Sequence, residues 1–179
     1  MLGFLLRNRY LIFAAAAAFI ADQVTKLLII QNVAFRTSWP DTGFFRFTHV
    51  GNTGSAFGLF GGQNVVLIGA SFVGVAILLY FYRQHPNPGL LVSGALGLML
   101  GGAFGNLTDR LVNGHVTDFI DVGPWWIFNL ADASIITGII MLAASVLLDG
   151  RTQPEPEVAP VGGPEAIVEE PSDDDAPSG

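Results

Sequence analysis

Four aspartates lie close together between residues 109 and 132, and three of them have apolar neighbours. They are Asp109, Asp118, Asp121 and Asp132. Two carboxyl groups that share a site cannot both ionise easily, so one keeps a proton and the pair can hold a water molecule. In peptide hydrolysis the ionised member takes a proton from that water, and the protonated member polarises the scissile carbonyl. The aspartates therefore indicate acid–base hydrolysis.

Asp118 and Asp132 are the two aspartates that we expect to form this pair. Asp118 precedes an apolar loop and Asp132 opens an apolar helix, so folding can bring them together. A simpler interpretation stays open, in which Asp132 is a first-turn acid favoured by the helix dipole and Asn129 is the N-cap. Asp109 and Arg110 are adjacent and are typical of interfacial ion pairs.

Other polar and aromatic residues have structural interpretations. Asp121 precedes Val-Gly-Pro, which is typical of a turn. Asp22 and Lys26 are four residues apart, so a helix would place them on one face as a pair that docks it. Trp125 and Trp126 are typical of membrane-interface anchors.

Several functional classes are excluded or disfavoured by composition. The chain has no Cys and three separate His, so thiol chemistry is excluded and a zinc peptidase is disfavoured. The sequence predicts no metal site and no cofactor. Its eight basic residues are too scattered to predict nucleic-acid binding.

Charge is scarce, and it is unevenly distributed along the chain. Only 13% of the 179 residues are charged, whereas a soluble domain typically has about 25%. Seven basic residues balance seven Asp in residues 1–150, and the segment 151–179 supplies the whole net charge of −7. Lipid is therefore the expected environment of residues 1–150. The segment 151–179 is expected to be a disordered acidic tail.

Four apolar segments are long enough, or nearly so, to cross a hydrocarbon core as helices. They cover about residues 10–30, 65–82, 89–107 and 130–148. The third segment is rich in glycine, which lets neighbouring helices approach closely in lipid. We predict an all-α integral membrane protein whose first helix is not cleaved, because its apolar run exceeds a usual signal peptide.

The basic residues predict the orientation of the helices. Arg7, Arg9, Arg83 and Arg151 flank one set of helix ends, which places both termini in the cytoplasm. The outer segments then contain Arg36, Arg46 and Arg110, so the short length of the inner segments, and not the count of basic residues, favours this orientation. Within the outer segment 31–64, residues 44–50 are aromatic and β-branched enough for a short strand. A small extracytoplasmic β-sheet is therefore expected, with Trp39 at the membrane interface.

Five stretches of the sequence resemble motifs of the lipoprotein signal peptidase family, also called signal peptidase II. The stretches are residues 22–26, 52–57, 101–110, 116–121 and 128–132. Each stretch alone is a weak signal, and the second is by itself an ordinary polar turn. Five stretches in the family's order, between four predicted spans, are specific.

The resemblance implies an aspartic endopeptidase of the bacterial inner membrane, with a four-helix fold and a small outer β-cradle. Such an enzyme removes the signal peptide from prolipoproteins after a diacylglyceryl group has been attached to the Cys that becomes the new N-terminus. The resemblance assigns catalysis to Asp118 and Asp132, in agreement with the spacing. The supporting polar residues would be Asp22, Lys26, Asn52, Asn106, Asp109, Arg110 and Asn129.

The resemblance also implies inhibition by cyclic peptide antibiotics that occupy the aspartate pair. We expect the active site to face the extracytoplasmic side and the protein to be a monomer. Two features depart from the family pattern: Ser55 stands where Ala is frequent, and the tail is no part of the family core. Rival interpretations are a channel or transporter subunit, with polar residues through the membrane depth, and a scaffold that recruits partners through the tail.

Overall fold

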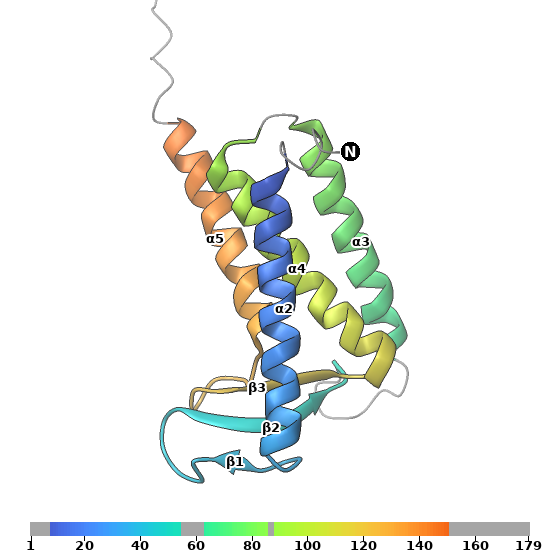
Figure 1. Cartoon of the computed structure of the whole chain (residues 1–179), viewed down its shortest axis with the longest axis vertical. Coiled ribbons are helices and arrows are strands. Elements are labelled where there is room, and N and C mark those ends of the chain that lie inside the picture. The colour runs from blue at the N-terminus through green and yellow to red at the C-terminus, as the bar shows by residue number, and fades with distance from the viewer. Residues whose placement is uncertain (1–7, 55–62, 86–87, 151–179) are drawn as a thin grey trace, which may run out of the picture.

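A computed structural model describes residues 8–54, 63–85 and 88–150 of the chain. Its elements are α2 (Arg9–Asn32), β1 (Ser38–Trp39), β2 (Arg46–Asn52), α3 (Gln63–Gln84), α4 (Leu90–Asn113), β3 (Val116–Asp121) and α5 (Leu130–Gly150). The four helices run side by side, and the sheet lies across one end of them (Figure 1). Arg7, Ser55 and the tail 151–179 lie outside the described residues.

All four helices are long and apolar enough to cross a membrane, judged by length and composition. Their outer surfaces carry large apolar side chains, which lipid solvates at no cost. α4 is the exception, because 56% of its 18-residue apolar stretch is buried inside the protein. The corresponding share is 17% or less in the other three helices. The chain is therefore a multi-pass membrane protein with α4 at its centre.

The helices approach α4 through its glycines. A Cβ at Gly101 would collide with the backbone of Ala15 in α2, and one at Gly102 would collide with the backbone of Ala131 in α5. In lipid there is no hydrophobic driving force between helices. Close packing of small residues stabilises the association of the helices instead. The expected helix–helix contact face of the third span is confirmed.

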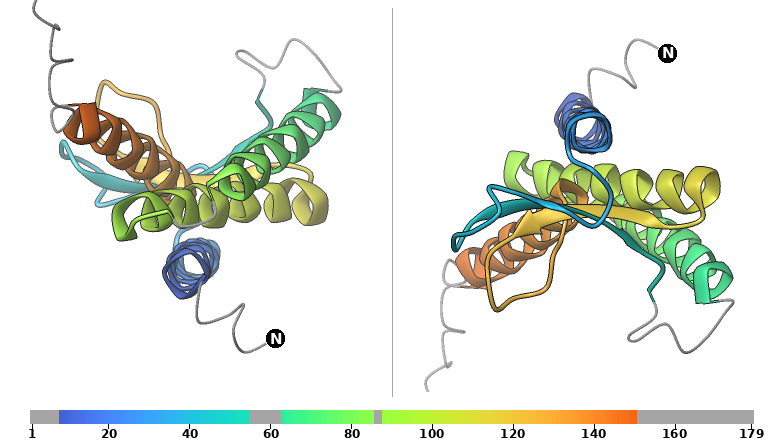
Figure 2. Two further views of the ribbon diagram at one scale, coloured as in Figure 1. Left: turned by 90° about the horizontal axis from the view of Figure 1, so that it is seen from above. Right: turned by 90° about the horizontal axis from the view of Figure 1, so that it is seen from below.

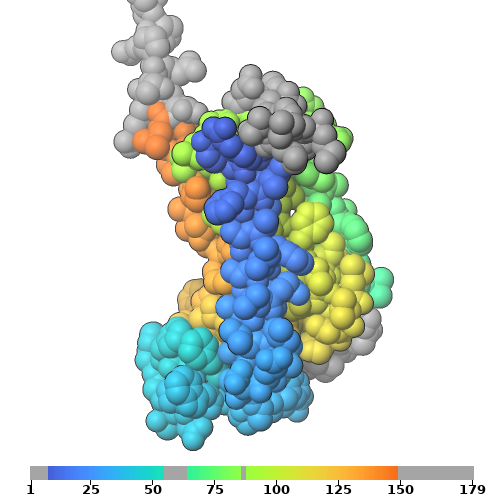
Figure 3. Space-filling model, viewed as in Figure 1, coloured from blue at the N-terminus to red at the C-terminus, as the bar shows by residue number. Residues whose placement is uncertain are grey.

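The other three helices are arranged unequally around α4. α2 lies on one side of α4, while α3 and α5 lie on the other side and spread apart (Figure 2). The main helix contacts of α3 are with α4, and those of α5 are with α4 and α2. The space-filling view shows α2 crossing the front of the molecule down to the sheet end (Figure 3).

The elements differ from the prediction in three places. The third helix continues to Asn113 instead of ending near residue 107, and Gly114 with φ 76° ends it in the left-handed conformation. Asn106, Asp109 and Arg110 therefore lie on the helix and not beyond it. Residues 116–121, for which no strand was predicted, form strand β3, and the strand expected at 44–50 is observed at Arg46–Asn52.

The sheet has three antiparallel strands in the order β1-β2-β3. β2 and β3 pair from Arg46 opposite Asp121 to Asn52 opposite Val116, with a register shift in between. β3 is almost entirely buried, because it lies between β2 and the ends of the helices. This position places the middle of β3 against the start of α5.

Candidate active site

The predicted aspartate pair lies where β3 meets α5. Asp118 comes from the middle of β3 and Asp132 comes from the first turn of α5. Both line one cavity of about 420 Å³. The cavity wall also includes Asn52, Trp125, Trp126, Ile127, Phe128, Ile135 and Ile136. Asp118 is only 2% exposed, whereas Asp132 is partly exposed.

Asn129 joins the two carboxyl groups. Its side-chain Nδ2 donates to Asp118 Oδ1 at 2.7 Å, and its backbone N–H donates to Asp132 Oδ2 at 3.3 Å. In return, Asn129 Oδ1 accepts the backbone N–H of Asp132 at 2.9 Å. This reciprocal arrangement is a capping box, so Asn129 is the N-cap of α5. The cap and the cavity-lining position of Asp132 are thus compatible, and the two earlier interpretations of Asp132 are not exclusive.

Two further asparagines complete the hydrogen bonds of the pair. Asn52 Nδ2 donates to Asp118 Oδ2 at 2.8 Å, and Asn106 Nδ2 donates to Asp132 Oδ1 at 2.8 Å. Each of the four carboxyl oxygens of Asp118 and Asp132 therefore has an N–H donor. Asn106 Oδ1 in turn accepts Asn129 Nδ2 at 3.1 Å. Three asparagines from β2, α4 and the cap of α5 fix both carboxyl planes.

Burial raises the pKa of Asp118 to about 6 from an ordinary value of 3.8. The hydrogen bonds from Asn52 and Asn129 and the charge of Lys26 oppose this rise, and the nearby charge of Asp132 adds to it. Burial dominates because a carboxylate loses the solvation of water. Asp118 therefore keeps its proton to a higher pH than an ordinary aspartate does.

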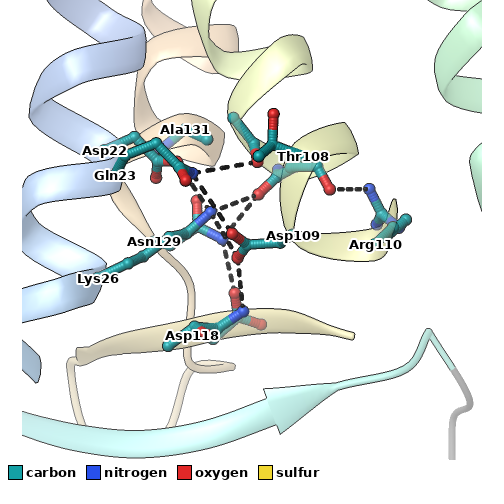
Figure 4. A network of polar contacts seen from close by, with 12 residues as sticks. Asp22, Gln23, Lys26, Thr108, Asp109, Arg110, Asp118, Asn129 and Ala131 are labelled. Atoms are coloured by element: carbon teal, nitrogen blue, oxygen red, sulfur yellow. Dashed lines mark hydrogen bonds and ion pairs between the residues drawn. The ribbon is translucent and has the colours of Figure 1, made fainter. Parts of the chain in front are cut away.

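A buried ion-pair cluster docks α2 onto this site (Figure 4). Lys26 Nζ lies 2.8 Å from Asp22 Oδ2 and 3.0 Å from Asp109 Oδ2, and all three side chains are almost fully buried. Asp22 Oδ1 also accepts the backbone N–H of Ala131, and Asp109 Oδ2 accepts that of Thr117. The docking interpretation of Asp22 and Lys26 is confirmed. Asp109 was expected to form an ion pair at the membrane interface. In the structure it is buried and pairs with Lys26 instead.

Arg110 turns away from the ion-pair cluster, toward α3 (Figure 4). Its guanidinium donates to Ser71 Oγ at 3.5 Å and to the Asn106 carbonyl at 3.4 Å. Its Nε is buried without a hydrogen-bond partner among the described residues. Arg110 and Asn106 line a second cavity, about 490 Å³ and mostly apolar, between α3, α4 and α5. Ile135 lines both cavities, so the two are neighbours.

Sequence reasoning missed several contributors to the site. Gln23 donates to Asp22, to Asp109 and to the Gly105 carbonyl, although a glutamine on an apolar helix carries no signal of such a role. Trp125 and Trp126 were expected to be interface anchors, and these exposed, stacked rings also line the cavity of the aspartate pair.

Asp121 has a larger role than the predicted turn. Its Oδ1 accepts the backbone N–H of Gly123, which is the expected turn contact. Its Oδ2 is bound by Arg46 at 2.7 Å and by the Thr48 hydroxyl at 2.8 Å. Burial works against ionisation, but the hydrogen bonds from Thr48, Gly123 and Arg46 prevail and hold the pKa of Asp121 below its ordinary value.

The four apolar helices, and the two carboxyl groups that line one cavity, define the class as a multi-pass membrane protein with a two-carboxylate site. Residues 14–148 match the family model of signal peptidase (SPase) II, and the chain belongs to this family.

Relatives and a solved structure agree with this assignment. The lipoprotein signal peptidase of Dehalococcoides mccartyi is 44% identical over 136 residues, which cover 72% of this chain and 83% of the relative. That of Moorella thermoacetica is 43% identical over 133 residues, covering 74% and 89%. A bacterial membrane enzyme solved by the in meso method at 2.3 Å resolution superposes with a TM-score of 0.72 at 31% identity. That comparison covers 83% of this chain and 94% of the enzyme.

Proposed function

We propose that this protein is an aspartic endopeptidase that removes the signal peptide from diacylglyceryl-modified prolipoproteins by cleaving before the modified Cys. Membership of the signal peptidase II family supports the reaction. One structural observation carries the aspartic mechanism. Asp118 and Asp132 line one cavity, and every oxygen of both carboxyl groups is held by an N–H donor.

In the proposed mechanism the pair shares one proton, and Asp118 is its preferred holder because its pKa is raised to about 6. Asp132 accepts a proton from a water molecule held between the carboxyl groups, and that water attacks the scissile carbonyl. The Asp118 proton polarises the same carbonyl oxygen. The proton held by Asp132 then passes to the leaving amine. This route uses only side chains of the protein and water.

The active site is proposed to face the extracytoplasmic side of a bacterial inner membrane. α2 begins and α5 ends at the helix ends opposite the sheet, and the aspartate pair lies at the sheet end. Arg9 and Arg83 lie at the end without the sheet, which the positive-inside rule places in the cytoplasm. At the sheet end, Arg46 pairs with Asp121, Arg110 faces a cavity inside the helix group, and Arg36 is exposed.

The lipid part of the substrate is proposed to lie in the apolar cavity between α3, α4 and α5. That cavity is lined mostly by aliphatic side chains and is a neighbour of the cavity of the aspartate pair through Ile135. Acyl chains are most stable in such an environment, while hydrolysis requires water beside Asp118. We also propose that cyclic peptide antibiotics inhibit the enzyme by occupying the aspartate pair, and that the enzyme works as a monomer.

The decisive experiment compares a lipid-modified preprolipoprotein with its unlipidated counterpart as substrates for the purified protein. We expect cleavage of the lipidated form alone. Asp118→Asn and Asp132→Asn should each abolish cleavage while the protein still folds, and Asp41→Asn, at an exposed carboxylate, is the matched control. Full activity in either of the first two variants would disprove the paired-aspartate mechanism.

The orientation has its own test, which does not depend on activity. A reporter fused after Leu148, at the end of the fourth apolar span, should give a cytoplasmic signal. A second reporter in the exposed segment at Asp41 should give an external one. The reverse pattern would invert the proposed topology.

A further inference from the structure

Strands β2 and β3 change register between the two ends of their pairing. Phe47 pairs with Ile120, whereas the next recorded pair is Val50 with Asp118. Two residues of β2 therefore stand opposite the single residue Phe119 of β3. This arrangement is a β-bulge, which inserts one extra residue into one strand and reverses the face of every residue beyond it.

The bulge decides whether Asn52 reaches Asp118. With the bulge, Asn52 pairs with Val116, and because side chains alternate along a strand, Asn52 and Asp118 share a face. Without the bulge, the register of the pair Phe47–Ile120 would continue along the strand. Asn52 would then stand opposite His115. Its side chain would then point away from Asp118, and the 2.8 Å hydrogen bond between them would be lost.

The first bulge residue, Thr48, is held by the far end of β3. Its hydroxyl donates to Asp121 Oδ2 at 2.8 Å and lies 2.8 Å from the hydroxyl of Ser38 in β1. The guanidinium of Arg46 binds the same Asp121 oxygen through two nitrogens, at 2.7 and 3.0 Å. Thr48 and Asp121 are both buried, so the bond between them is shielded from water and is stronger than at a surface.

The second bulge residue, His49, is held from the opposite side. Its backbone N–H donates to the Thr37 carbonyl at 3.1 Å, and its own carbonyl accepts the N–H of Arg36 at 2.8 Å. Its ring Nδ1 lies 2.9 Å from the Val33 carbonyl oxygen. The backbone and the ring of His49 are thus held by the chain that follows α2, on the side of β2 opposite β3.

We propose that the Thr48–His49 bulge fixes the register of β2 against β3, and we call it the register lock. In this proposal Asp121, Arg46 and Thr48 are positioning residues for the peptidase reaction. They act at a distance, by placing Asn52 on the face of β2 that holds Asp118. The catalytic part of this inference rests on the proposed function. The register part rests on the sheet alone.

The register can be measured without activity, because the chain has no Cys. Residues paired across a sheet lie within the Cα separation that a disulfide requires. With Asn52→Cys and Val116→Cys together, we expect rapid cross-linking upon oxidation, and with Asn52→Cys and His115→Cys we expect little. Adding Thr48→Val and Asp121→Asn should shift cross-linking from the first pair toward the second. An unchanged cross-linking pattern in that background would overturn the register lock.

Activity then tests whether the lock acts through Asn52. Asn52→Ala and Asp121→Asn should each lower kcat/KM about tenfold, the effect of losing one hydrogen bond to a charged group. The double variant should be no worse than either single variant, because both changes remove the same contact. Independent, multiplying losses would refute the positioning role. Thr48→Ser, which keeps the hydroxyl, should retain activity, whereas Thr48→Val should not.

The pH profile gives a readout that general destabilisation would not produce. The hydrogen bond from Asn52 lowers the pKa of Asp118, so its loss should move the alkaline limb of kcat/KM to higher pH in Asn52→Ala and Asp121→Asn alike. The other groups that act on Asp118 are unchanged in these variants: Asp132, Asn129, Lys26 and Arg110. If the wild-type protein cleaves no lipoprotein, the proposed function fails while the cross-linking result still decides the register.

Discussion

Replacing Asp118 by asparagine should change the stability of the protein in a direction that depends on pH. In the folded protein, burial raises the pKa of Asp118 from 3.8 to about 6, so the folded state binds the proton more tightly than the unfolded chain does. The stability that this proton provides is fully present below about pH 4. It is lost as the pH rises through about 6. Asparagine is never ionised, so it avoids this loss.

The size of the effect follows from the pKa shift and the hydrogen bonds. A shift of about two units corresponds to ~3 kcal/mol between low and high pH. Asparagine offers one acceptor oxygen to two donors, the side-chain amides of Asn52 and Asn129, and the unpaired donor costs about 1–2 kcal/mol. Rotating Asn129 to compensate would break its cap on the Asp132 N–H. Asp118→Asn should therefore destabilise the fold by about 1–2 kcal/mol at pH 4 and stabilise it by a similar amount at pH 8.

The assay is reversible unfolding of wild type and Asp118→Asn in the same detergent from pH 4 to pH 8. The difference between the two unfolding free energies should change sign within this range. Asp41→Asn, at an exposed carboxylate, makes the same chemical change at the surface and serves as the matched control. Parallel stability curves for wild type and Asp118→Asn would show that burial does not raise the pKa of this carboxyl group.

Three further outcomes are expected. Lys26→Met should destabilise the fold by about 3–5 kcal/mol in denaturant titrations, because it leaves two buried carboxylates without their cation; a loss below 1 kcal/mol would contradict this. Gly102→Leu should lower the melting temperature by forcing α4 from α5, whereas Gly69→Leu, whose Cβ meets open space, should not; equal shifts would refute the close-packing account. The kcat/KM for lipoprotein cleavage should fall above about pH 6, where Asp118 loses its proton; a rate that rises steadily through pH 8 would contradict the assignment of Asp118 as proton holder.

The four spans, and the meeting of Asp118 and Asp132 at one cavity, were predictable because their signals are local. Each span is an apolar run of sufficient length, and the order of the spans brings the end of the third and the start of the fourth to one side. The end of α4 was placed too early, because Asp109 and Arg110 resemble residues at a membrane interface. In the structure Lys26 pairs with Asp109 and the Thr117 N–H donates to it, and the helix continues to Asn113.

The features that were not predictable depend on contacts between distant segments. The bulge in β2 is set by bonds from Thr48 to Asp121 and from His49 to the chain after α2, and the types of these residues carry no signal of a register shift. The same limit applies to Gln23, whose three acceptors lie on its own helix and on α4.

The amide group of Asn129 has a consequence for biogenesis. Its Nδ2 donates to Asn106 in α4 and to Asp118 in β3, while its oxygen caps α5. A nascent chain with two or three spans inserted has neither the second aspartate nor this bridge. The proposed mechanism therefore requires that α5, the last of the four spans, has docked against α4 and β3.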